Sequence, residues 1–172
     1  MATAANKAEP FLAGSPPGSA GARTVAEAAA GPAPLPPGVP LALHHVAIVV
    51  ADLEAAVERY AALGFAGAER FSLPAQGIEA VTFAAGPGYL ELIRPTDPGG
   101  AIARFLGKRG EGLHHVAYRV PDLGAVLRRL TDAGVRLIDE TPRTGAHGWR
   151  IAFVHPDSCH GVLTELVEVE GS

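Results

Sequence analysis

A stretch of 23 residues occurs twice in this chain, and this repeat constrains the fold more than any other feature of the sequence. Residues 43–65 read LHHVAIVVADLEAAVERYAALGF, and residues 113–135 read LHHVAYRVPDLGAVLRRLTDAGV. The two copies are identical at 11 of the 23 positions. Because internal repeats indicate copies of one supersecondary unit, we expect two equivalent modules.

The composition is that of a globular chain and excludes several classes of partner. Of the 172 residues, 48% are hydrophobic and 19% are charged, which is enough apolar material for a core. A formal net charge of -4 provides no basic surface for nucleic-acid phosphates. The single cysteine, Cys159, cannot form an internal disulfide, and no apolar run approaches the roughly 20 residues that span a bilayer. We therefore expect a cytoplasmic protein with no nucleic-acid or membrane partner.

Residues 1–40 differ in composition from the rest of the chain. They are rich in Ala, Pro and Gly and contain few large apolar side chains. Such a segment cannot bury enough surface to offset the entropy lost on ordering, so we predict a disordered tail. It lacks the apolar core of a secretory signal, and Glu9 and Glu27 argue against a transit peptide. The folded domain is expected at residues 41–172.

The first predicted module spans residues 42–95. The valine-rich run at 43–50 is typical of a strand, and Asp52 can cap a helix that Gly64 ends. Further strands are predicted at residues 68–73, 78–85 and 89–93, separated by turn signals rich in Gly and Pro. The order is therefore β-α-β-β-β.

The second module, residues 112–169, repeats that order after a linker helix at 100–111. A strand is predicted at residues 113–120, a helix at 122–133, and further strands at 135–139, 150–155 and 162–167. The fold class is α+β. Two tandem β-α-β-β-β modules would form an eight-stranded, curved open sheet with a helix behind each half.

Strand alternation selects one histidine from each copy of the repeat. His45 shares a face with Ala47 and Val49, whereas the β-branched residues between them can pack under the helix. His115 is equivalent in the second module. The same alternation predicts that His44 and His114 point away from this face.

Each module also places a glutamate between apolar neighbours in its last strand, Glu91 in one and Glu165 in the other. Burying a carboxylate is costly unless it has a partner or a metal. Two imidazoles and two carboxylates could surround one divalent cation, and these donors suit Zn, Co, Mn, Ni or Fe. A strand glutamate more often faces solvent, and duplication alone can retain paired residues. The recurrence of both residue types at matching places favours a shared metal site.

Several stretches of the chain resemble the methylmalonyl-CoA epimerase family of the vicinal oxygen chelate superfamily, which also contains glyoxalase I and extradiol dioxygenases. The general resemblance lies in the paired modules and their HHVA starts. The narrower one is carried by AQGIEAVTF, YLELIRP, GEGLHHVAYRV, GAHG and HP-x4-GVL-x-ELVE, and it covers residues 42–168.

The resemblance implies an epimerase that interconverts (R)- and (S)-methylmalonyl-CoA by metal-assisted removal of an α-proton through an enolate. The metal ligands it implies are His45, Glu91, His115 and Glu165, around Co, Mn, Zn or Ni. An acyl-CoA substrate and a homodimer are the expected partners. The alternatives are a glyoxalase I-like lactoylglutathione lyase and a non-catalytic ligand-binding member of the superfamily.

The chain departs from the family at the position of one base. Some epimerases carry a catalytic glutamate where this sequence has Ala80, and Glu79 should face the other side of its strand. This leaves Glu91 and Glu165 as the candidate catalytic bases. In some family members the position of Glu91 is a glutamine. Candidate substrate-binding residues are Gln76 and His147.

Overall fold

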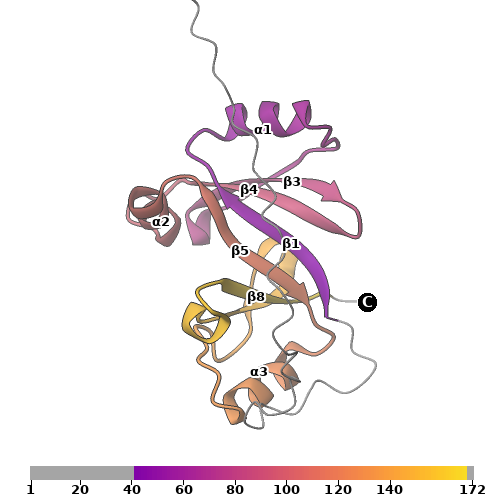
Figure 1. Ribbon diagram of the computed structural model, residues 1–172, viewed down its shortest axis with the longest axis vertical. Coiled ribbons are helices and arrows are strands. Elements are labelled where there is room, and N and C mark those ends of the chain that lie inside the picture. Colours follow the sequence, from indigo (N-terminus) through magenta and orange to yellow (C-terminus); the bar gives the residue numbers. More distant parts are fainter. Residues whose placement is uncertain (1–40, 170–172) are drawn as a thin grey trace, which may run out of the picture. The chain divides into compact units, whose positions relative to one another are not determined.

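The two copies of the repeated LHHVA segment form the central strands of one sheet. The computed structural model describes residues 41–169. Strands β1 (Ala42–Val49) and β5 (Gly112–Arg119) run side by side and antiparallel (Figure 1). Each pairs in parallel on its other side with the last strand of its own half, β1 with β4 (Gly88–Pro95) and β5 with β8 (Leu163–Glu168).

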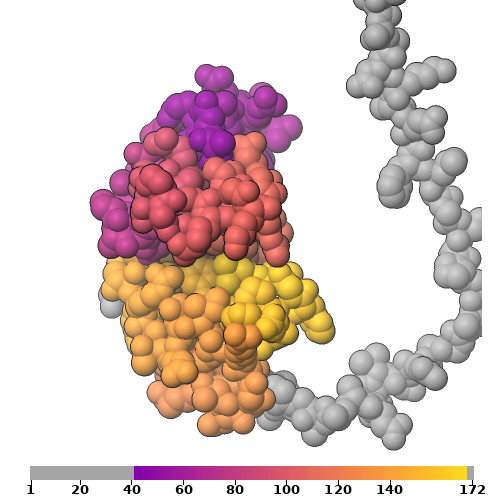
Figure 2. Space-filling model, turned by 90° about the vertical axis from the view of Figure 1, so that its left-hand side faces the viewer, coloured from indigo at the N-terminus to yellow at the C-terminus, as the bar shows by residue number. Residues whose placement is uncertain are grey.

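The remaining strands extend the sheet outward in both directions. They are β2 (Glu69–Leu73), β3 (Ile78–Ala85), β6 (Arg143–Thr144) and β7 (Arg150–Val154). The strand order is β2-β3-β4-β1-β5-β8-β7-β6, so the two halves have the same internal order. The prediction of paired β-α-β-β-β units in an eight-stranded, curved open sheet is confirmed. The space-filling view shows residues of the first half gathered at one end and those of the second half at the other (Figure 2).

Helices α1 (Leu53–Ala62) and α3 (Leu123–Asp132) occupy equivalent places in the two halves (Figure 1). Each begins after an aspartate whose side chain accepts a hydrogen bond from a backbone N–H in the first turn. Asp52 accepts from Ala55 at 3.0 Å and Asp122 from Ala125 at 2.8 Å. Such caps stabilise a helix by about 1 kcal/mol, so the repeated aspartate sets both helix starts.

The core has two layers on either side of the sheet. On the outer face, α1 packs against Val81, Phe83 and Leu92, and α3 packs against an equivalent cluster in the second half. Burying a side chain such as Phe83 stabilises the fold by about 1.5–3 kcal/mol. On the opposite face, called here the inner face, α2 (Ala101–Arg109) covers part of the first half, contacting residues around Ile93. Short 3-10 turns lie at Pro74–Gln76, Ala146–Gly148 and Pro156–Cys159.

The strand predicted at residues 135–139 is wrong. This segment touches β7 through a single bridge between Leu137 and Val154 and through isolated backbone hydrogen bonds. The side chain of Asp139 then accepts the N–H of Phe153 at 2.9 Å. The Asp139 carboxylate thus accepts a hydrogen bond that a backbone carbonyl would accept if the two segments formed a continuous β-ladder. The outermost strand of this half is instead β6.

The predicted disordered tail, residues 1–40, lies outside the described residues, so that prediction stays untested. The proposed module boundaries at 42–95 and 112–169 remain our division of the chain. Within residues 41–169, no helix combines the length and apolar character needed to cross a membrane.

Candidate metal centre and substrate cavity

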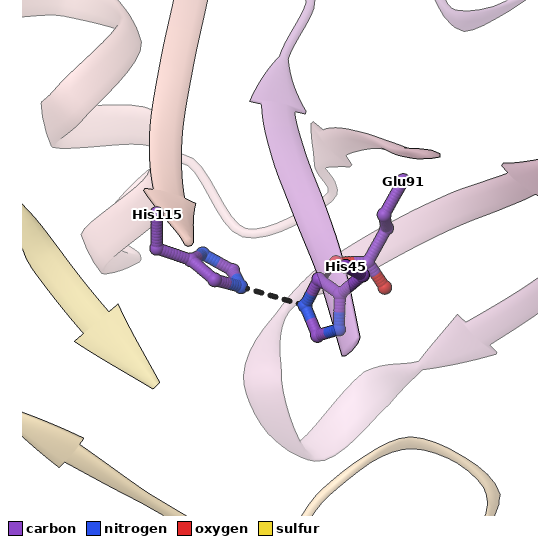
Figure 3. A group of neighbouring side chains, drawn as sticks. All are labelled: His45, Glu91 and His115. Carbon is purple, nitrogen blue, oxygen red and sulfur yellow. Dashed lines mark hydrogen bonds and ion pairs between the residues drawn. The ribbon is translucent and has the colours of Figure 1, made fainter. Parts of the chain in front are cut away.

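The two histidines selected by strand alternation meet at the centre of the sheet. Across the antiparallel pair, Ala47 lies opposite His115 and His45 lies opposite Ala117, so both imidazoles project from the inner face. Their Nε2 atoms are 2.9 Å apart, and both side chains are buried. Figure 3 shows the two rings pointing toward one another, with the Glu91 carboxyl beside His45.

The glutamates come from the neighbouring parallel strands in matching register. Glu91 on β4 pairs with Ala47, and Glu165 on β8 pairs with Ala117. An oxygen of Glu91 lies 3.5 Å from Nε2 of His45. Oε2 of Glu165 lies 3.1 Å from Nε2 of His45 and 3.4 Å from Nε2 of His115. All four predicted metal-ligating side chains are therefore buried together.

The electrostatics of this group separate its two carboxyls. Burial alone would raise the pKa of Glu165, but the adjacent imidazoles lower that pKa to about 2. Burial alone would lower the pKa of His45, and the carboxylates of Glu165 and Glu91 instead raise it. The pKa of Glu91 is raised because burial outweighs the attraction of the imidazoles. Glu165 is therefore ionised at neutral pH, and Glu91 holds a proton more readily.

The group is compatible with a divalent metal. One ligand atom each from His45, Glu91 and His115 lies within 4.8 Å of the others. Oε2 of Glu165 is buried, and no residue in the described range 41–169 donates a hydrogen bond to it with suitable geometry. A buried carboxylate oxygen without a donor is costly in a protein, and a cation would remove that cost. These imidazole and carboxylate donors therefore fit a divalent cation, as expected from the sequence.

The prediction that His44 and His114 point away from the site is wrong. His44 has no opposite residue on β5, and His114 has none on β1, because each is the extra residue of a β-bulge. Each ring instead lies against the next histidine, with Nδ1···Nδ1 distances of 2.8 Å in both pairs. The pKa of each of these outer histidines is lowered to about 4, first by burial and next by the neighbouring imidazole. Both are neutral at pH 7.

A cavity of about 370 Å³ opens above the four buried groups. Its walls are largely apolar and include Ile93, Ile102, Ile151, Phe153 and Val167. Gln76 lines it, as predicted for a substrate-binding residue. Arg143 also lines it, stacked over the Phe153 ring at 5.2 Å. Arg143 was not among the residues predicted for the site, although it lies two residues before the GAHG motif.

A second cavity, of about 180 Å³, reaches the site from the other side of His45 and Glu91. The exposed residue His147 lines this smaller cavity and is not among the residues lining the larger one. Trp149 lines both cavities and contacts His147 and His44, with ring centroids 4.8 and 4.5 Å away. Trp149 therefore stands between the two spaces.

The side chains of Glu79 and Ala80 point to opposite faces of β3, as strand alternation predicted. Ala80 pairs with Ile93 and lies buried on the inner face. Glu79 points to the other side and forms an ion pair with Arg94 at 2.6 Å, beside Asp52. No carboxyl at this part of β3 reaches the site within the described chain.

Comparisons with known proteins place the chain in a family. The profile of the Glyoxalase/Bleomycin resistance protein/Dioxygenase superfamily matches residues 44–153. The chain is 38% identical over 130 residues to an ethylmalonyl-CoA/methylmalonyl-CoA epimerase of Cereibacter sphaeroides, covering 74% of this chain and 97% of that protein.

Solved structures of similar proteins point to the same family. The crystal structure of methylmalonyl-CoA epimerase from Mycobacterium tuberculosis matches with a TM-score of 0.69 and 44% identity, covering 73% of this chain and 86% of that one. A methylmalonyl-CoA epimerase in complex with methylmalonyl-CoA and NH4+ matches with a TM-score of 0.70 and 38% identity, covering 76% and 96%. The chain belongs to the glyoxalase, bleomycin resistance protein and dioxygenase superfamily, and within it to the methylmalonyl-CoA epimerase family.

Proposed function

We propose that this protein is an epimerase that interconverts (R)- and (S)-methylmalonyl-CoA. The observation that carries the proposal is the buried group of two imidazoles and two carboxylates on the floor of a largely apolar cavity. Relatives named as epimerases of this substrate support it, one of them solved with methylmalonyl-CoA bound. These relatives do not favour the glyoxalase I-like lyase.

The reaction removes the C2 proton of the thioester from one face and returns a proton to the opposite face of the enolate, which requires either two acid-base groups or one that reaches both faces. His45, Glu91, His115 and Glu165 would hold one divalent cation, Co, Mn, Zn or Ni, which would supply a Lewis acid for the developing enolate oxygen. The apolar walls exclude water from the reacting carbon and accept the 2-methyl group. Arg143 and Gln76 would bind polar groups of the acyl-CoA in the larger cavity. His147 would bind the substrate from the smaller cavity.

The base of the proposed reaction is Glu91. Ala80, where some epimerases carry a glutamate, offers no acid-base group. Glu91 is nearby on the same face, because it pairs with Thr82 while Ala80 pairs with Ile93, two residues along the same ladder. In the metal-free site, burial raises the pKa of Glu91. The pKa of Glu165, about 2, suits a group that remains ionised.

The test is exchange of the C2 proton of methylmalonyl-CoA in deuterated buffer, measured on metal-stripped protein and on samples reloaded with each metal. Exchange should require a metal. Methylglyoxal with glutathione, offered to the same samples, tests the glyoxalase alternative. The absence of C2 exchange in every reloaded sample would overturn the epimerase assignment.

Three substitutions separate the base from the ligands. Glu91→Gln should keep the metal, because an amide oxygen can still coordinate it, while losing about 10²–10⁴-fold in exchange. Glu165→Gln should weaken metal binding itself. Glu79→Gln is the matched control, since it breaks only a partly exposed ion pair on the other face. Wild-type exchange in Glu91→Gln would exclude Glu91 as the base.

A homodimer and a cytoplasmic location complete the proposal. Size-exclusion chromatography with light scattering tests the first, and fractionation of the source cells tests the second.

A further inference from the structure

Each proposed metal-binding histidine is preceded by a second histidine that the strand pairing forces out of alternation. In the antiparallel ladder, Leu43 and His45 face consecutive residues of β5, so His44 is left over. In the same way, Ala47 and Ile48 of β1 pair with His115 and Leu113, so His114 has no pairing partner on β1. The antiparallel crossing of two identical segments makes the two bulges equivalent.

Because a bulge turns its extra residue, both outer rings lie beside the site. His44 is 1% exposed and meets Trp149 edge to face, with centroids 4.5 Å apart. His114 meets Phe105 of α2 in the same way at 4.8 Å. Aromatic rings from distant parts of the chain thus hold each outer histidine against the inner one.

The hydrogen-bond geometry fixes where the protons must be if Nε2 binds the metal. Nε2 of His45 and of His115 face one another and the carboxylates, so a coordinating neutral ring carries its proton on Nδ1. Within the described residues, the acceptor in reach of that proton is Nδ1 of the preceding histidine, at 2.8 Å in both pairs. A neutral imidazole has one donor and one acceptor, so each outer ring must carry its proton on Nε2.

Within the described chain, the remaining nitrogen of His44 makes no hydrogen bond that competes with this arrangement, although the assigned tautomer leaves its N–H buried without an acceptor, which carries a cost. Its Nε2 is buried and has no hydrogen-bond partner among residues 41–169. The position of the His44 ring is therefore not explained by a hydrogen bond at Nε2. Among residues 41–169, the polar contact of the His44 side chain is made by its other nitrogen, Nδ1, which faces His45.

We propose that His44 and His114 are positioning residues that accept the Nδ1 protons of His45 and His115 and so aim both Nε2 atoms at one metal ion. This inference rests on the metal site of the proposed function. Partners of this kind orient a coordinating ring, and their loss typically weakens metal binding about 10–100-fold. A neutral acceptor also adds no negative charge to the site beyond that of the glutamates.

The test measures metal affinity and protonation, without reference to turnover. Affinity is obtained by titrating the stripped protein with Zn²⁺ against a competing chelator. His44→Leu and His114→Leu should each weaken Zn²⁺ binding about 10–100-fold. His44→Asn, whose amide oxygen can accept the same proton, should recover much of the loss. Leu43→Ala and Leu113→Ala are the matched controls, since these exposed side chains flank the same bulges without meeting an imidazole.

Long-range ¹H–¹⁵N spectra of the Zn²⁺-loaded wild-type protein report the tautomer of each ring directly. They should show protons on Nδ1 of His45 and His115 and on Nε2 of His44 and His114. A proton on Nδ1 of His44, or wild-type affinity in a folded His44→Leu protein, would overturn the inference while leaving the metal site intact. A wild-type protein that binds no divalent metal would overturn the site as well. If His44→Leu fails to fold, the wild-type spectrum and the less buried His114 still decide the matter.

Discussion

Gly88, the first residue of β4, should not tolerate even alanine. Its φ lies outside the left-handed region, so an alanine there is not strained by its own backbone. A Cβ would nevertheless stand 2.8 Å from the carbonyl oxygen of His44 and 3.2 Å from that of Leu43. These are backbone atoms of the β1 bulge and cannot rotate away. Overpacking of this kind costs about 1–3 kcal/mol, so Gly88→Ala should lower the free energy of unfolding by that amount.

The assay is denaturant unfolding of the metal-free protein, supported by the melting temperature, which should fall by about 3–5 °C per kcal/mol in a domain of this size. Zn²⁺ affinity should fall with it, because the bulge carries His44 and leads directly into His45. Gly107→Ala is the control of opposite sign. Gly107 lies in α2 with nothing within 4 Å of its Cβ position, so alanine should stabilise the helix by up to about 1 kcal/mol. A Gly88→Ala protein within about 0.5 kcal/mol of wild type would refute the reasoning.

Three further outcomes are expected. In the metal-free protein, the part of the free energy of unfolding that depends on His44 and His114 should be constant above about pH 6.5 and fall as the pH drops toward 4, because the unfolded chain then binds protons at these two histidines that the folded chain does not. The raised pKa of His45 acts in the opposite direction. The loss should approach roughly 3 kcal/mol for each of His44 and His114, and urea titrations of His44→Leu should show a shallower pH dependence. Trp149→Ala should join the two cavities and make room for a larger acyl group. The value of kcat/KM for a longer 2-alkylmalonyl-CoA should therefore rise relative to the value for methylmalonyl-CoA. An unchanged ratio of the two values would show that Trp149 does not limit the size of the acyl group. Arg143→Ala should raise KM for the acyl-CoA several-fold with little change in kcat, and an unchanged KM would remove Arg143 from substrate binding.

Local patterns were enough to place the four buried polar groups. Alternation along a strand selects a face, and it correctly put His45 and His115 on the inner side of β1 and β5. The glutamates followed from their apolar neighbours and from their recurrence at matching places in both modules. The repeat then implied that both sets meet, because equivalent modules in one sheet bring equivalent positions together.

Alternation failed where a residue's direction depended on another strand. Nothing in the LHHVA segment shows that its first histidine lies in a bulge, because a bulge is a mismatch in register between two strands. The segment at 135–139 failed for a related reason. Its apolar pattern is that of a strand, but Asp139 takes a β7 N–H with its side chain and interrupts the ladder. Arg143 was missed because its place at the cavity depends on β6 and the Phe153 ring.

The sequence by itself determined the number and order of the modules, the capped starts of both helices, and the four residues that converge on the inner face. These depend on interactions within a few residues and on a period that is constant along each strand. Only the tertiary structure decided that His44 and His114 stand behind the two inner histidines, that Trp149 divides the space above them, and that Glu165 has a buried oxygen without a donor. Those features arise from the register and packing of segments far apart in the chain, and no local pattern carries that information.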